Sequence, residues 1–304
     1  MYRLPHRTLA SPPSGLPRLV AFDIDGTLLT PQGCLRERTA TALASLSEAG
    51  VITALATGRP WPQTETVARQ VPTLSYAVCL NGATVMDATA NERIADRSMT
   101  HVEAVEAAEI VRKHLPKASL GLDMADGRHL WEPQFAPGMP ADLLAELSVV
   151  RVADAIAEVD GAVLTWLVHS SDLDTLAMVE LLAPRMPLGT EIRPSGLDMA
   201  EIAAAGVNKS AGLEIVCERY GISASQVTVF GDGLNDIEML SWAGYGVAMA
   251  NASAAVRSVA DHIAPANEDD GVAAVVEAML AGSQWPSSAE AAEVAVPTNG
   301  AHLG

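Results

Sequence analysis

The chain has 304 residues, of which 49% are hydrophobic, and it carries a formal net charge of −18. A chain of this length can build one large domain or two modest ones around a substantial core. The charge argues against binding nucleic acid or an anionic membrane, because both interactions depend on Lys and Arg side chains that neutralise phosphate groups. It would also repel a small phosphorylated substrate, so a site for such a substrate must supply its own cations or a metal.

No apolar run reaches the roughly 18 residues needed to span a bilayer, and the first twenty or so residues lack the apolar stretch of a signal peptide. We therefore expect a cytoplasmic protein. The three cysteines, Cys34, Cys79 and Cys217, are far apart and show no metal-ligand spacing. We predict three buried thiols, with neither a disulfide nor a zinc site.

Apolar runs that indicate strands alternate with helical patterns at both ends of the chain. The predicted strands are 19–24, 51–56, 76–80, 227–230, 245–249 and 262–264, and the predicted helices are 36–49, 61–70, 209–220, 234–242, 252–260 and 270–281. Such alternation is typical of a mostly parallel sheet covered by helices. We therefore predict an α/β fold with a doubly wound, Rossmann-like core.

The middle of the chain interrupts this rhythm. It contains helix-like stretches at 101–115 and 173–182, a Gly- and Pro-rich passage at 121–140 and an apolar strand at 162–169. About 115 residues with apolar runs of their own suffice for an inserted domain with its own core. We predict a core built from 17–83 and 201–282, an inserted α+β cap domain at 84–200, and disordered segments at 1–16 and 283–304.

The hexapeptide Asp23-Ile24-Asp25-Gly26-Thr27-Leu28 follows the first predicted strand. In open α/β sheets, ligands bind at the carboxyl ends of the strands. An Asp in this position can act as a nucleophile, and a second Asp two residues later can move protons for it. Metal binding without covalent chemistry is the alternative for such a pair.

Three further motifs follow other predicted elements. Thr57-Gly58-Arg59 offers a hydroxyl and backbone N–H groups to a phosphate oxygen, although Thr-Gly also occurs in ordinary turns. Lys209 begins a helix, where a cation opposes the helix dipole; an ordinary surface lysine is the alternative. Gly231-Asp232-Gly233-Leu234-Asn235-Asp236 combines two carboxylates and two glycines, which suits a hard cation.

Together and in this order, the four motifs resemble the haloacid dehalogenase superfamily of phosphohydrolases, and in particular its Cof-like branch, whose cap follows the second motif. Three further stretches add to the resemblance: Asn81-Gly82-Ala83, Val247-Ala248-Met249-Ala250-Asn251-Ala252 and Glu268-Asp269-Asp270-Gly271-Val272-Ala273. The spacing independently places the cap. Thr57 follows Asp25 by 32 residues, which one loop, one helix and one strand use up, whereas Lys209 follows Thr57 by 152 residues. The cap must therefore be inserted after Thr57.

The resemblance implies a phosphatase in which Asp23 attacks phosphorus to form an aspartyl-phosphate, while Asp25 acts first as an acid and then as a base. It also implies Mg²⁺, with the Asp23 and Asp232 carboxylates and the Asp25 backbone carbonyl as ligands and with Asp236 orienting a metal-bound water. A cation is needed on physical grounds too. Two like charges 4 Å apart repel by about 4 kcal/mol even at an effective dielectric constant of 20.

The same resemblance assigns phosphoryl binding to Thr57, Gly58, Lys209 and Asn235. Candidate substrate-binding residues are Arg59, Asn81 and Gly82, and for Arg59 a surface salt bridge is the alternative. In the cap, four residues are candidates to line a substrate pocket, or alternatively to fill the cap's own core: His129, Trp131, Phe135 and Trp166.

The expected substrate is a small phosphorylated metabolite, such as a sugar phosphate or a phosphorylated cofactor, and the expected state is a monomer or homodimer. A phosphotransferase or mutase, which passes the phosphoryl group to a second hydroxyl, is the enzymatic alternative. A non-catalytic regulatory protein on the same fold is disfavoured, because every residue that the chemistry needs is present.

Overall fold

The computed structural model describes residues 11, 13, 15–71, 73–135, 138–195 and 197–287. The chain forms two compact units, one of Met1–Ala54 with Gly221–Gly304 and one of Leu55–Tyr220, so the division falls inside strand β2 (Ile52–Ala56). The predicted core (17–83 with 201–282) and cap (84–200) have other boundaries than these two units, and this division of the chain remains a prediction.

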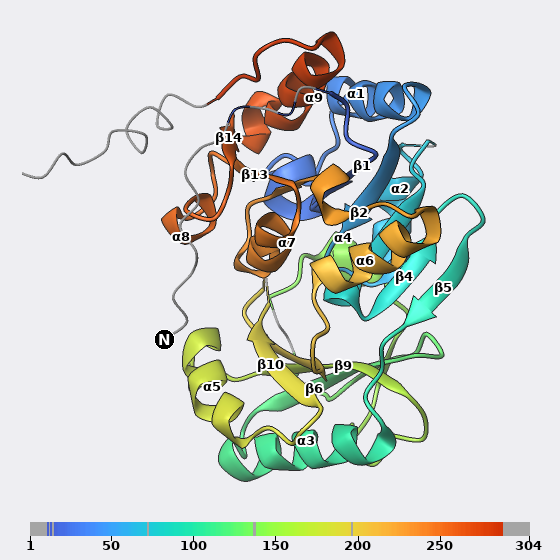
Figure 1. Cartoon of the computed structure of the whole chain (residues 1–304). Coiled ribbons are helices and arrows are strands. Elements are labelled where there is room, and N and C mark those ends of the chain that lie inside the picture. The colour runs from blue at the N-terminus through green and yellow to red at the C-terminus, as the bar shows by residue number, and fades with distance from the viewer. Residues whose placement is uncertain are drawn as a thin grey trace, which may run out of the picture. The chain divides into compact units, whose positions relative to one another are not determined.

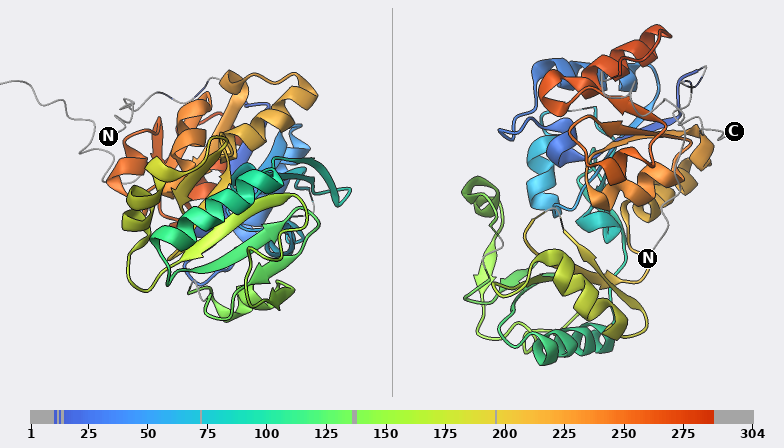
Figure 2. Two further views of the ribbon diagram at one scale, coloured as in Figure 1. Left: turned by 90° about the horizontal axis from the view of Figure 1, so that it is seen from below. Right: turned by 90° about the vertical axis from the view of Figure 1, so that its left-hand side faces the viewer.

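The first unit is built on a parallel sheet. Its strands follow the order β14-β13-β12-β1-β2, and β1, β12, β13 and β14 pair in parallel. Helices α1 and α9 lie side by side (Figures 1 and 2). The bounds are β1 (Leu19–Phe22), β12 (Val227–Gly231), β13 (Tyr245–Met249), β14 (His262–Ala264), α1 (Glu37–Glu48), α7 (Ile237–Trp242), α8 (Ala254–Arg257) and α9 (Gly271–Ala281).

Every side chain of strand β1 is apolar and fully buried, as a strand covered on both faces requires. Phe22 at its end stacks on Phe230 of β12, with ring centroids 5.1 Å apart. The parallel pairing of β1 and β12 brings their carboxyl ends to the same edge of the sheet. The first and fourth motifs therefore start next to each other.

The second unit contains two sheet regions. Strands β3, β4 and β5 form an antiparallel meander, accompanied by α2 and α6. The bounds are β3 (Tyr76–Cys79), β4 (Thr84–Asp87), β5 (Glu92–Asp96), α2 (Trp61–Ala68) and α6 (Lys209–Tyr220).

The other region is a six-stranded sheet in the order β10-β11-β9-β6-β7-β8. Helices α3 and α5 cover one of its faces (Figures 1 and 2). The bounds are β6 (Ser119–Met124), β7 (His129–Trp131), β8 (Val149–Arg151), β9 (Val163–His169), β10 (Thr190–Pro194), β11 (Ala200–Ala204), α3 (His101–His114), α4 (Ala141–Ala145) and α5 (Thr175–Leu182).

The predicted α/β class with a mostly parallel sheet is confirmed, and many elements match closely. Helix 209–220 and the strands 245–249 and 262–264 have the predicted bounds. The strand predicted to end at residue 24 ends at 22, because a tight turn follows it. The passage at 121–140 contains most of strand β6 and all of strand β7, neither of which its Gly and Pro content predicts.

The prediction of three buried thiols is confirmed for Cys79 and Cys217 and wrong for Cys34. Burial raises the pKa of Cys79 to about 12 and that of Cys217 to about 11, so both thiols are unreactive at neutral pH. Cys34 is exposed because it lies in the turn between β1 and α1, where no element covers it.

The packed part of the first unit extends past residue 282. Trp285 is buried, and its ring lies 5.0 Å from that of Tyr245 and 5.8 Å from that of His262. The rest of the predicted disordered tail, from residue 288, and most of the predicted disordered segment 1–16 lie outside the described residues. Within the described residues, no helix combines the length and the hydropathy needed to cross a bilayer.

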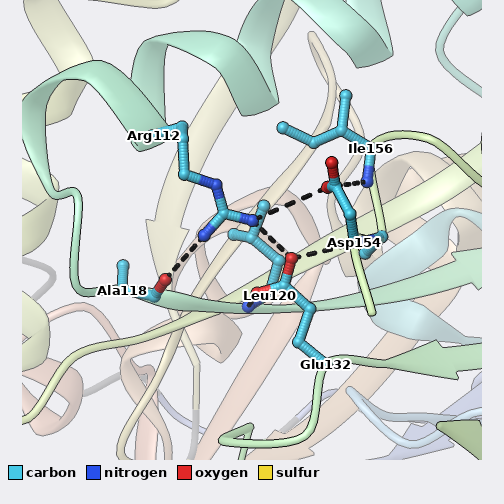
Figure 3. Close-up of polar contacts among 7 residues, drawn as sticks. Arg112, Ala118, Leu120, Glu132, Asp154 and Ile156 are labelled. Carbon is cyan, nitrogen blue, oxygen red and sulfur yellow. Dashed lines mark hydrogen bonds and ion pairs between the residues drawn. The ribbon is translucent and has the colours of Figure 1, made fainter. Parts of the chain in front are cut away.

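The buried Glu132 carboxylate links strand β6 of the six-stranded sheet to helix α3 and to the loop at Ala155 (Figure 3). Glu132 accepts hydrogen bonds from the backbone N–H groups of Leu120 (2.9 Å) and Ala155 (3.2 Å) and pairs with the Arg112 guanidinium. Arg112 in turn donates to the carbonyl of Ala118 (2.9 Å). Glu132 is almost fully buried, so its charge depends on these partners.

Replacement of Arg112 by Met should lower the free energy of unfolding by about 1–3 kcal/mol, because it leaves the Glu132 carboxylate without its counter-charge. Arg69→Met is the matched control: it removes an exposed pair with Glu65 and should cost only about 0.3–0.5 kcal/mol. Urea unfolding of the full-length variants measures both. Equal losses would mean that the Glu132 network contributes no more than a surface pair.

Candidate active site

The first unit gathers three carboxylates at the carboxyl ends of β1 and β12. Asp23, Asp232 and Asp236 each offer one oxygen, and these oxygens lie within 4.8 Å of one another. Asp23 is 6% exposed and Asp236 is fully buried. A set of oxygen donors with this much negative charge fits a hard divalent cation such as Mg²⁺.

The loop around Gly26 orients Asp232. The Thr27 hydroxyl donates to one oxygen of Asp232 (2.9 Å), and the Asn251 amide donates to the other (3.3 Å) and to the Gly26 carbonyl (2.8 Å). Gly26 has φ +76°, and a Cβ there would overlap the Asp232 carboxylate. The first motif therefore needs glycine at this position, both for its backbone conformation and for space.

Asp236 holds its own loop in place. One of its oxygens accepts hydrogen bonds from the backbone N–H groups of Asp232 (2.9 Å) and Gly233 (2.8 Å). These charge-assisted bonds fix the turn that presents Asp232. Asn235 lies in the same short turn, close against Gly233.

Asp25 differs from the other three. Its side chain is exposed, and its carboxylate is outside the group that Asp23, Asp232 and Asp236 form among the described residues. The predicted contribution of Asp25 to metal binding is its backbone carbonyl, which leaves the carboxylate for proton transfer.

The second unit joins the Thr57 motif to the loop after β3. The Thr57 hydroxyl accepts from the Arg59 backbone N–H (3.1 Å), and the Thr57 carbonyl accepts from the Asn81 N–H (2.9 Å). A second bond runs from the Leu80 N–H to the Arg59 carbonyl (3.1 Å). These hydrogen bonds thus bring together four predicted site residues: Thr57, Gly58, Arg59 and Asn81.

Helix α6 begins directly beside this loop. Gly82 has φ +105°, and a Cβ there would overlap the carbonyl of Asn208. The next residue, Lys209, is fully buried, so it is not the ordinary surface lysine that the sequence left as the alternative. A buried ammonium requires anionic or polar partners, which makes Lys209 suitable for holding a phosphoryl group.

Two residues that bond to the candidate site residues lie outside the four sequence motifs, one in each unit. Glu201 on β11 accepts a hydrogen bond from the Asn81 amide (2.7 Å). Burial raises the pKa of Glu201 above its ordinary value, against the opposing effect of its bonds to Ser195 and Asn81. The other residue is Asn251 of the first unit, within the family-like stretch 247–252, and its amide orients Asp232.

The four candidate residues for a substrate pocket separate onto different sides of the six-stranded sheet. Trp166 is buried in the core beneath α3, where its indole N–H donates to the Ala104 carbonyl (2.9 Å). The core alternative is therefore correct for Trp166. Trp131 and Phe135 are also buried and belong to a second hydrophobic core cluster, so the core alternative is correct for them as well. His129 bonds to Asp123 (2.6 Å).

A family model described as haloacid dehalogenase-like hydrolase matches residues 20–276. The chain belongs to this family. Its relatives include the 5-amino-6-(5-phospho-D-ribitylamino)uracil phosphatase YcsE of Bacillus subtilis, 27% identical over 85% of this chain and 94% of the relative. The pyridoxal phosphate phosphatase YbhA of Escherichia coli is 29% identical over 86% of this chain and 98% of the relative.

Solved structures agree on the fold. SMU.1108c from Streptococcus mutans superposes with a TM-score of 0.77 at 22% identity, over 87% of this chain and 99% of that chain. A HAD subclass IIB sugar phosphatase, BT4131, superposes with a TM-score of 0.74 at 23% identity, over 87% and 98%. The family and its named phosphatases make this chain a haloacid dehalogenase-like phosphatase, a phosphoric monoester hydrolase.

Gly82→Ala should lower the free energy of unfolding by about 2–4 kcal/mol, because it adds a clash with the Asn208 carbonyl to the strain of a positive φ. Gly127→Ala is the control: its φ is +92°, but nothing lies near its Cβ position, so it should cost about 1–2 kcal/mol. Thermal and urea unfolding give the comparison. If both variants lose the same free energy of unfolding, the close approach of Gly82 to the Asn208 carbonyl does not contribute to stability.

Proposed function

We propose that the protein is a cytoplasmic, Mg²⁺-dependent phosphatase that hydrolyses a small phosphorylated metabolite through an aspartyl-phosphate on Asp23. The observation that carries this proposal is the group of three carboxylate oxygens at the ends of β1 and β12. Relatives whose names specify pyridoxal phosphate and a phosphorylated ribitylaminouracil support a sugar phosphate or a phosphorylated cofactor as the substrate.

In the first half-reaction, an oxygen of Asp23 attacks phosphorus, and the bond from phosphorus to the ester oxygen breaks. Protonated Asp25 donates its proton to the departing alkoxide. The exposure of the Asp25 side chain allows it to exchange protons with solvent, and its place two residues from Asp23 suits the transfer.

In the second half-reaction, the Asp25 carboxylate accepts a proton from a water molecule, whose oxygen attacks phosphorus. The bond between phosphorus and Asp23 breaks, orthophosphate leaves, and both aspartates return to their starting protonation states. Water is the acceptor in this scheme, which distinguishes a phosphatase from a phosphotransferase.

The ligands for Mg²⁺ would be the Asp23 and Asp232 carboxylates and the Asp25 carbonyl, with Asp236 holding the loop and orienting a water. When bound, the cation supplies charge neutralisation for the phosphoryl oxygens. Thr27 and Asn251 would keep Asp232 turned toward it.

Thr57, Gly58, Lys209 and Asn235 would bind the phosphoryl group, and Lys209 would compensate the charge of the transition state. Arg59, Asn81 and Gly82 are proposed to contribute to substrate binding. The proposed catalytic core consists of residues 17–83 and 201–282. The proposed cap, residues 84–200, decides which substrate is accepted.

Phosphate release should require a divalent cation, and after chelation Mg²⁺ should restore it better than Ca²⁺, because the smaller ion holds a compact octahedral geometry. Mg²⁺ should also raise the Tm of the native chain, and Asp232→Asn should abolish that rise. Phosphate release without any added acceptor alcohol separates hydrolysis from phosphotransfer. Full activity in excess chelator would contradict the metal assignment.

Asp23→Asn should reduce turnover by more than tenfold, a loss of at least about 1.4 kcal/mol in barrier terms, while leaving the fold intact, because the amide is a poor nucleophile of nearly the same shape. Asp25→Asn should slow both half-reactions. The matched control Asp172→Asn removes an exposed charge and should retain full activity. Substrate radiolabelled in its phosphoryl group should label the native chain but not Asp23→Asn. Retention of more than a tenth of the native activity by Asp23→Asn would contradict the covalent mechanism.

A further inference from the structure

The six-stranded sheet carries a line of polar side chains on the face opposite α3 and α5. His129, Asp123, Thr165 and Ala203 are successive cross-strand partners on β7, β6, β9 and β11. Directly paired residues share a face of a sheet, and so do residues two apart on one strand. Glu201, two residues before Ala203, therefore lies on this face too. We call His129, Asp123, Thr165 and Glu201 the polar row.

Two members of the polar row, His129 and Asp123, bond to each other. Nδ1 of His129 lies 2.6 Å from an oxygen of Asp123, and both side chains are almost fully buried. Burial lowers the pKa of His129, but the bond to Asp123 and its charge outweigh this effect and raise the pKa above its ordinary value. Because Nδ1 bonds to Asp123, Nε2 is the ring nitrogen left for another partner.

Two polar atoms on this face have no hydrogen-bond partner within the described part of the chain: the hydroxyl of Thr165 and the indole N–H of Trp131. Thr165 is 1% exposed and Trp131 is also 1% exposed. A buried polar atom without a partner costs free energy, so native proteins usually satisfy it with water or a ligand. Both atoms can donate a hydrogen bond.

The polar row is connected to the motif assigned to phosphoryl binding. Asn81 bonds through its side chain to Glu201 (2.7 Å) and through its backbone N–H to the Thr57 carbonyl (2.9 Å). One residue thus spans the Thr57 loop and the six-stranded sheet. These bonds place Glu201, which is one end of the polar row, beside the Thr57 loop, so the row leads away from the place where a phosphate held at Thr57 would carry its ester group.

We propose that the polar row binds the leaving group of the phosphate ester and selects an electrically neutral group rich in hydrogen-bond acceptors, such as hydroxyl, carbonyl or ring nitrogen. This inference rests on the proposed phosphatase function. His129 is already bonded to Asp123, so it offers no free cation to a second anion, and the polar row contains no other basic side chain. The unpaired donors instead match uncharged acceptors.

The test compares phosphate release from four metabolites and one minimal substrate. A hexose monophosphate and pyridoxal phosphate have neutral leaving groups, phosphoglycerate and phosphogluconate carry a carboxylate, and 4-nitrophenyl phosphate offers almost nothing for the row to bind. The wild-type kcat/KM should be at least about tenfold higher for the better neutral ester than for either carboxylated one.

Thr165→Val should lower kcat/KM for that neutral ester at least about tenfold more than for 4-nitrophenyl phosphate, chiefly through KM. Thr165→Ser keeps the hydroxyl and should recover the wild-type preference. The matched control is Thr190→Val on the same sheet: its hydroxyl bonds to the Pro187 carbonyl, away from the row, and its loss should affect both substrates by the same factor.

Two results would overturn the inference while phosphatase activity stands: equal proportional losses on both substrates in folded Thr165→Val, or a wild-type preference for the carboxylated esters. If Thr165→Val does not fold, failure of Thr165→Ser to keep the wild-type preference would overturn it equally. Absence of phosphate release from every ester by the wild-type chain with Mg²⁺ would instead overturn the proposed function, and this inference with it.

Discussion

Mutual repulsion among carboxylates is the constraint on which the first unit depends. Three of them meet within 4.8 Å in a chain whose net charge is already −18. The fold compensates part of this with donors aimed at the carboxylate oxygens, namely the Thr27 hydroxyl, the Asn251 amide and the backbone N–H groups beside Asp236. Neutral donors orient such charges but do not cancel them, which leaves a place for a divalent cation.

The second unit solves a different problem, that of placing a buried ammonium and a hydroxyl precisely. Backbone bonds tie Thr57 to the loop after β3, and the close approach of Gly82 to Asn208 sets where α6 begins. The backbone of Lys209, the first residue of α6, is therefore placed by this packing. Through Asn81 and Glu201, the same loop also reaches the six-stranded sheet. One short segment therefore links the Thr57 loop to the Glu201 end of the polar row.

Elements whose character is local were predictable. Strand β1 is a continuous apolar run, and helix α6 has the bounds that its pattern predicted. The missed elements lack such signals: β6 includes Asp123 and Gly121 among its apolar residues, and β7 is only three residues long. Cys34 was predicted to be buried because isolated thiols usually are, yet a turn gives it nothing to pack against.

The sequence alone determined the order of the motifs, the strand ends or helix start that they adjoin, and the types of side chain that they bring, because each depends on neighbouring residues and on apolar runs. Only the tertiary structure decided which distant side chains meet. Glu201 bonds to Asn81 across 120 positions of the chain, and Asn251 orients Asp232. The polar row likewise exists only through strand register, since a slip of one residue would turn Asp123 and Thr165 to the opposite face. Register is set by the packing of the whole sheet, which no local stretch of sequence contains.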